Sequence, residues 1–227
     1  MRTATQKVFD WLWGSYKEMP DSKKSALCSI FQSFKDCSWY TDEKSGVKCY
    51  LVQSSIKAIN FDILTEWLCQ GVTTMSADSM AFTQSYVYLI EFKSGNQVKG
   101  NLTAQDLKAN ITGKINSSDD TIFNKILPNV KYLNRDNVKL RFCLVVDIVA
   151  MGIKPQANLW AQLSVGKNKK QNQYINTLKN KIMPNLQKGI RNKCHFDKTE
   201  IWYSEVFDKH LEAHEIKDIE EMLRGRR

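Results

Sequence analysis

The sequence predicts an α/β domain in which a mixed central sheet is flanked by helices on both faces. Segments with the alternation of strands begin near Cys49, Met75, Tyr86, Leu140 and Ile201, and segments with helical apolar spacing separate them. The strand that begins at Tyr86 is apolar on both of its alternating sides, which is typical of a strand covered on both faces. A chain of 227 residues is long enough to bury such a core, so we expect a single domain over 1–227.

Residues 1–53 are expected to form a helical and hairpin extension of this domain. Their apolar spacing predicts two amphipathic helices, the second of which has Phe31 and Phe34 on its inner side and ends near Cys37. A strand hairpin is expected over 39–53, divided by a charged turn.

Residues 54–150 are expected to form the core, and residues 151–227 to complete the fold. In chain order, the core elements are a helix over 61–69, strands from Met75 and from Tyr86, helices over 103–115 and 119–133, and a strand over 139–149. The last part has the pattern of a helix over 171–190 and a strand over 201–206. Asp147 is expected to be a buried acid.

Charged residues interrupt the apolar strand that begins at Tyr86. Glu91 and Lys93 share one side of it, and burying such charges requires partners or a metal ion. Asp78, on the preceding strand, also lies on an apolar side. The register of the hairpin at 83–85 decides whether the carboxylates meet. A four-residue loop places Asp78 opposite Glu91, a two-residue loop places it on the diagonal, and a three-residue loop separates them across the sheet.

Two carboxylates that converge repel each other unless a cation lies between them, and oxygen ligands suit Mg²⁺ or Mn²⁺. The backbone carbonyl of Phe92 is a further candidate ligand. Lys93 could orient an attacking water, accept its proton and stabilise charge on phosphorus. Asp78, Glu91 and Lys93 together therefore predict hydrolysis of phosphodiester bonds.

The order of Asp78, a hairpin turn and Glu91-Phe92-Lys93 resembles the signature of the PD-(D/E)XK nucleases, which have the restriction-endonuclease-like fold. The resemblance covers about residues 60–149. It implies a restriction-endonuclease-like core, metal binding by the Asp and the Glu, and a lysine that acts as catalytic base or electrostatic partner.

Two features of the resemblance concern residues near the motif. Ala77 stands where the superfamily often has a proline before the Asp. Members often hold a further acid on the helix before the sheet, which makes Glu66 a candidate metal ligand. Asp62 competes with it, but its place near the helix start favours a cap or a dipole partner.

The net charge of +9 is concentrated in one part of the chain. Residues 148–196 contain no Asp or Glu, and such a basic segment is an electrostatic footprint for phosphate backbones, although a merely solvated basic face would look the same. The expected nucleic-acid contacts are Lys108, Lys114, Lys167, Lys169, Lys170, Lys179, Lys181, Lys188, Arg191 and Lys193.

The sequence therefore predicts a Mg²⁺- or Mn²⁺-dependent nuclease that acts on DNA in preference to RNA. An RNA endonuclease is kept as a further hypothesis. The alternative is an inactive module of the same fold that binds nucleic acid or a ribonucleoprotein through its basic C-terminal half. In that case Glu91 and Lys93 would be an ordinary ion pair at a strand end. A homodimer is a possible assembly.

Cysteines and termini bear on the compartment. The six cysteines form no CxxC pair and lie in apolar contexts, which predicts reduced core thiols. Residues 1–6 lack a signal-peptide core, and no apolar stretch reaches the ~20 residues that span a bilayer, so we expect an intracellular, cytoplasmic protein without a membrane partner. Cys194, His195, His210 and His214 could be drawn as a zinc set, but solvated histidines are the preferred interpretation.

Overall fold

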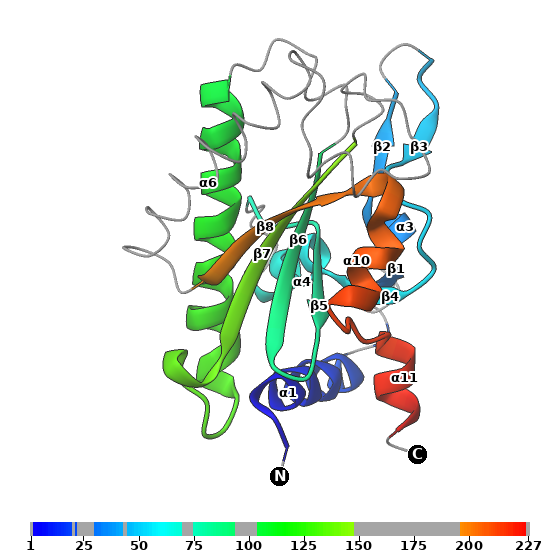
Figure 1. Ribbon diagram of the computed structural model, residues 1–227. Coiled ribbons are helices and arrows are strands. Elements are labelled where there is room, and N and C mark those ends of the chain that lie inside the picture. The colour runs from blue at the N-terminus through cyan, green and yellow to red at the C-terminus, as the bar shows by residue number, and fades with distance from the viewer. Residues whose placement is uncertain are drawn as a thin grey trace.

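The computed structural model describes residues 2–19, 21, 30–42, 45–69, 75–93, 104–147 and 196–225. At its centre is a six-stranded sheet with the order β1-β4-β5-β6-β7-β8 (Figure 1). The strands are β1 Phe31–Ser33, β4 Lys57–Asn60, β5 Ser79–Phe82, β6 Tyr86–Lys93, β7 Lys139–Val146 and β8 Phe196–Tyr203. Neighbours from β1 to β6 are antiparallel, whereas β6, β7 and β8 are parallel. The predicted α/β class with a mixed central sheet is confirmed.

Helices cover both faces of this sheet. They are α1 Ala4–Glu18, α3 Phe34–Cys37, α4 Phe61–Leu68, α6 Ala104–Asp120, α10 Phe207–Ala213 and α11 Ile219–Arg224. α6 continues into a π-helical segment, η1 Thr121–Ile126, and a 3-10 turn, η2 Leu127–Asn129; further 3-10 turns are η3 Arg135–Asn137 and η5 Ser204–Val206. α1, α4, α6 and η1 supply the core on one face, and α3 and α10 supply it on the other.

β6 is the strand around which both cores are built. Val87 and Leu89 point into the core under α6, whereas Tyr88 and Ile90 point into the core under α10. Every residue of β6 after Tyr86 is buried. Both sides of this segment are apolar in the sequence because helices enclose the strand on both faces of the sheet.

The second predicted helix is wrong over its last part. Phe31 belongs to β1, which pairs with β4 through Phe31 and Ile59, and only one helical turn, α3, follows it. Ser33 caps that turn, because its Oγ accepts the Asp36 N–H at 3.0 Å. Apolar spacing over so short a segment fits a helix and an edge strand equally well, and pairing with β4 decides in favour of the strand. Residues 22–29 of the prediction lie outside the described residues.

The predicted hairpin is present, but it does not join the central sheet. β2 Trp39–Thr41 and β3 Lys48–Tyr50 pair in antiparallel register as a separate two-stranded sheet. The strand near Cys49 was therefore assigned to the wrong sheet. Its expected place is taken by β4, a four-residue strand that the alternation pattern did not reveal.

The N-terminal segment is part of the core. Val8, Phe9 and Leu12 of α1 are buried against the same sheet face as α6, and β1 forms the sheet edge.

Among the described residues, no helix combines the length and the apolar character that a bilayer crossing requires. The helix expected over 171–190 lies outside the described residues.

The histidines of α10 differ from the preferred interpretation. His210 is only 4% exposed, its ring stacks on Trp202 at 5.2 Å, and its Nε2 accepts the Tyr203 N–H at 3.2 Å. Burial lowers the pKa of His210 to about 4. His214 stacks on the same indole at 5.0 Å. The expectation of a solvated ring is wrong for His210, whereas the His214 side chain is 23% exposed. Cys194 and His195 of the drawn zinc set lie outside the described residues.

Two smaller expectations concern other core residues. Asp147, expected to be buried, is only half-buried just after β7. Cys37, Cys49, Cys69 and Cys143 are free thiols, as expected, and Cys37 and Cys143 are buried.

Candidate active site

The hairpin between β5 and β6 brings the two predicted carboxylates together. Ser79 pairs with Ile90 and Phe82 with Val87, so Asp78 and Glu91 are next in the same register. Four residues lie between the paired residues Phe82 and Val87, and within them the Thr83 N–H donates to the Tyr86 carbonyl at 2.9 Å. This register places the carboxylates opposite each other, as expected for a four-residue separation. The turn needs no glycine, because the Thr83 Oγ1 accepts the N–H groups of Ser85 and Tyr86, at 3.1 and 2.9 Å.

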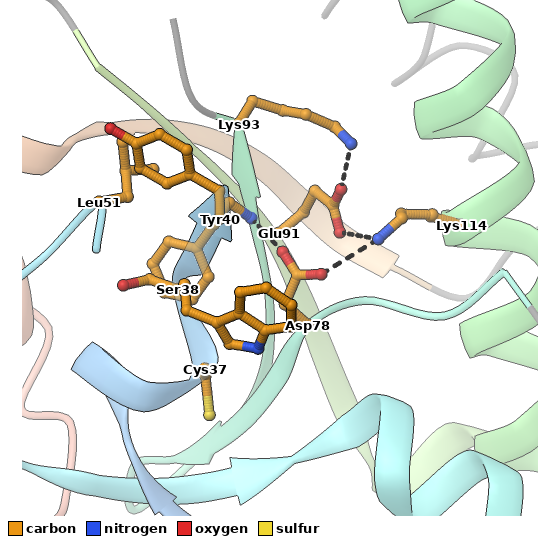
Figure 2. Close-up of a pocket in the computed structure, with 10 residues that line it drawn as sticks. Cys37, Ser38, Tyr40, Leu51, Asp78, Glu91, Lys93 and Lys114 are labelled. Carbon is orange, nitrogen blue, oxygen red and sulfur yellow. Dashed lines mark hydrogen bonds and ion pairs between the residues drawn. The ribbon is translucent and has the colours of Figure 1, made fainter. Parts of the chain in front are cut away.

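Glu91 is fully buried at the end of β6 and contacts two ammonium groups. Its Oε1 lies 2.6 Å from the Lys93 Nζ, and its Oε2 lies 2.7 Å from the Lys114 Nζ (Figure 2). Burial, and then the nearby charge of Asp78, raise the pKa of Glu91 to about 8, although both ammonium groups act in the opposite direction. A carboxyl group with this pKa is largely protonated at neutral pH, even with the two ammonium groups beside it.

Asp78, the residue directly before β5, completes the cluster. Its Oδ2 accepts the Phe92 N–H at 2.6 Å, which fixes the carboxylate against β6. Its Oδ1 lies 3.1 Å from the Lys114 Nζ. One ammonium group therefore contacts the carboxylates of both Asp78 and Glu91, as the dashed lines in Figure 2 show.

Lys114 reaches this position because α6 is fastened to the segment before β5. The Ser118 Oγ accepts the Ala77 N–H at 3.0 Å. A Cβ at Gly113 would lie 3.3 Å from the Met75 side chain, so the glycine allows α6 to approach closely. Burial alone would lower the pKa of Lys114, but the charges of Asp78 and Glu91 outweigh it and hold the pKa above its usual value.

The sequence predicts a different role for Lys114, that of a nucleic-acid contact. A signal for its inward position is nonetheless present, because Ile111 and Ile115 are buried on α6 and Lys114 lies beside them on the helix. The connection from β6 to the parallel strand β7 carries α6 back along the sheet, which brings its lysine to the end of β6. The structure thus adds a fourth charged residue to the predicted three.

A pocket opens beside these four side chains. Its lining is Cys37, Ser38, Trp39, Tyr40, Leu51, Asp78, Glu91, Phe92, Lys93 and Lys114. Figure 2 shows Tyr40 and Leu51 on the side away from Lys114. The cavity volume is about 120 Å³, and a single water needs roughly 10–15 Å³ by the same measure, so an ion with several waters fits. Burial, followed by the charge of Asp78, raises the pKa of the Cys37 thiol, which therefore stays protonated.

The donor set suits a hard divalent cation. Apart from the two ammonium groups, neither buried oxygen of Glu91 has a hydrogen-bond partner among the described residues. The part of the chain that the structure describes contains no group of three or more His, Cys, Asp or Glu side chains that could hold a metal. The protein ligands would then be the carboxylates of Asp78 and Glu91 and the carbonyl of Phe92, which is a set that Mg²⁺ accepts when water and phosphate supply the rest.

The acids of α4 are arranged differently from the expectation. Glu66 is exposed and does not line the pocket. Asp62 accepts a hydrogen bond from the Ser76 Oγ, two residues before Asp78, and its charge helps to raise the pKa of Lys114. The acid on α4 that acts on the site is therefore Asp62. Asn60 caps the helix instead, since its Oδ1 accepts the Ile63 N–H at 3.0 Å.

Most of the expected nucleic-acid contacts lie outside the described residues. These are Lys167, Lys169, Lys170, Lys179, Lys181, Lys188, Arg191 and Lys193. Lys108 belongs to α6, but its side chain is not among those described. Within the described residues, the basic groups at the site are Lys93 and Lys114.

Comparison of the chain with protein-family models, with curated proteins and with solved structures finds no match. The function must therefore be argued from the residues of the pocket.

Proposed function

We propose that this protein is a metal-dependent nuclease of the PD-(D/E)XK type that hydrolyses phosphodiester bonds, in DNA in preference to RNA. The observation that supports it most is the convergence of Asp78 and Glu91 on one ammonium group, at 3.1 and 2.7 Å. Two carboxylates that share one cation in a water-accessible pocket can share another. Lys93 lies on the same side of β6 as Glu91, as hydrolysis requires.

A Mg²⁺ or Mn²⁺ ion held by Asp78 and Glu91 would polarise the phosphoryl group and offset its charge. Lys93 orients the attacking water or accepts its proton, and its ammonium form stabilises the charge that develops on phosphorus. Lys114 contacts both carboxylates that would hold the ion, so the ion and the ammonium group would compete for them. Glu91 must lose its proton to bind the ion, so ion binding is weaker at low pH.

The experiment that tests this proposal is incubation of the protein with single-stranded and duplex DNA and RNA, in Mn²⁺ and in chelator. We expect cleavage in Mn²⁺ that stops in chelator and in Glu91→Gln. Glu66→Gln is the matched control, because it makes the same chemical change at an exposed position on α4. Absence of cleavage of all four substrates, or equal cleavage by Glu91→Gln, would contradict the proposal.

A second candidate function has one observation in its favour. Lys93 and Lys114 supply two positive charges, which balance the two carboxylates when both are ionised, so the cluster needs no metal ion for charge balance. An inactive module that binds nucleic acid could keep the fold in this way. A melting experiment separates the two candidates, because only a metal site predicts that Mn²⁺ stabilises the wild type and not Asp78→Asn.

A further inference from the structure

One wall of the pocket is built from the hairpin of β2 and β3 and carries aromatic side chains. Trp39 and Tyr40 line the pocket together with Asp78 and Glu91. The Trp39 side chain is nevertheless 55% exposed. A single exposed aromatic residue is ordinary on a protein surface, but the residues around Trp39 are not.

Lysines are placed on the rings of this hairpin. The Lys48 Nζ lies 5.0 Å from the ring centre of Trp39 and 5.5 Å from that of Tyr50. The Lys35 Nζ lies 4.9 Å from the ring centre of Tyr50. Trp39 pairs directly with Tyr50, and Lys48 is two residues away from Tyr50, so all three share one side of the hairpin. We call Trp39, Tyr50, Lys35 and Lys48 the aromatic–lysine face.

The hairpin holds this face in a fixed position relative to the carboxylates. Its turn is closed by the Asp42 N–H, which donates to the Val47 carbonyl at 2.9 Å, and Gly46 provides the positive φ of 68° that the turn requires. At its base, the Leu51 N–H donates to the Ser38 carbonyl at 3.1 Å. Ser38 and Leu51 themselves line the pocket.

We infer that the aromatic–lysine face is a stacking subsite for an unpaired base, so that the substrate of the pocket is single-stranded nucleic acid. This inference rests on the proposed nuclease function. Every base offers a flat face to an indole, but in a duplex both faces are covered by neighbouring base pairs. The lysines of the face complement the phosphates that flank such a base, and Trp39 also lines the pocket that holds Asp78 and Glu91.

The chain offers a matched control for this face. The Lys7 Nζ lies 6.0 Å from the ring centre of Tyr132, whose side chain is also exposed. Lys7 belongs to α1, and Figure 1 places α1 and the β2–β3 hairpin at opposite ends of the molecule. A non-specific effect of removing an aromatic residue or a lysine would appear equally at both pairs.

The test is the binding of a fluorescein-labelled oligothymidylate, and of a blunt duplex of the same length, measured by anisotropy in chelator so that no cleavage occurs. We expect Trp39→Ala to weaken single-strand binding by roughly fivefold to a hundredfold, and Trp39→Phe to restore most of it. Lys48→Gln should lower the salt slope of binding by about 0.7. Tyr132→Ala and Lys7→Gln should bind as the wild type does.

The inference is overturned if wild-type protein does not bind the single strand, if Trp39→Ala binds it as tightly as wild type, or if Tyr132→Ala loses as much affinity. Cleavage in Mn²⁺, measured on the same oligonucleotides, separates this inference from the proposed function. Cleavage together with an unchanged Trp39→Ala affinity would contradict the stacking subsite and support the proposed nuclease function. Binding that depends on Trp39 without any cleavage would contradict the proposed nuclease function and support the stacking subsite.

Discussion

Replacement of Glu91 by Gln should change how the stability of the protein depends on pH. The folded protein holds the Glu91 proton with a pKa of about 8, against 4.5 for an ordinary glutamate, because the carboxyl group is fully buried. Between these values the folded state binds more protons than the unfolded state, so a rise in pH removes stability. At about 1.4 kcal/mol for each pKa unit, the whole interval amounts to roughly 5 kcal/mol.

Gln has the shape of the protonated glutamate and does not titrate. At pH ~5 the two proteins should therefore be about equally stable, whereas at pH ~7 Glu91→Gln should be more stable by about 2–3 kcal/mol, or roughly 5–10 °C in Tm. The assay is urea denaturation of both proteins between these pH values. His210 contributes a slope of opposite sign below its usual pKa, but it is common to both proteins and cancels in their difference.

The control for this experiment is Glu66→Gln, which should follow the wild-type curve because Glu66 is exposed on α4. Saturating Mn²⁺ should raise the stability of the wild type at the higher pH, because the bound ion would offset the charge of the buried, ionised Glu91. If the free energy of unfolding had the same pH dependence in wild type and in Glu91→Gln, the reasoning would be refuted, because burial would then not raise the pKa of Glu91.

Three further outcomes are expected. Lys114→Met should bind Mn²⁺ roughly tenfold to a hundredfold more tightly by calorimetry, because the ion no longer displaces an ammonium group that contacts both carboxylates; weaker binding would contradict the competition. Lys93→Met should reduce cleavage by about 10²–10⁴-fold with little change in Mn²⁺ affinity, and near-normal rates would exclude Lys93 from the chemistry. His210→Ala should lower the free energy of unfolding by about 1–3 kcal/mol in urea, since the Tyr203 N–H loses its buried acceptor; an unchanged midpoint would show that water replaces it.

The part of the site that depends on a single strand could be predicted from the sequence. Alternation along β6 placed Glu91 and Lys93 on one side of a doubly covered strand, and the structure has both residues buried there. The register with Asp78 was left open, because Thr83 closes the turn by side-chain hydrogen bonds and none of the usual turn residues marks its length. The register that forms, with Asp78 opposite Glu91, is one of the options that alternation allowed.

The features that the sequence did not reveal depend on contacts between distant segments. Lys114 meets Asp78 because α6 crosses back over the sheet and is fastened beside β5, and helical spacing within α6 carries no information on that contact. Phe31 satisfied a helical pattern locally, yet pairing with β4 places it in a strand. His210 carries a polar ring on a charged helix, and only the position of Trp202 explains its burial.

The most direct test of the account is a calorimetric titration of Mn²⁺ into the wild-type protein and into Asp78→Asn at a pH above 8, where Glu91 is ionised. Asp78→Asn keeps the shape of the side chain and removes one of the two charges that would hold the ion. We expect the wild type to bind Mn²⁺ and Asp78→Asn to bind it far more weakly or not at all. Equal binding by the two proteins, or no binding by the wild type, would contradict the claim that Asp78 and Glu91 form a metal centre.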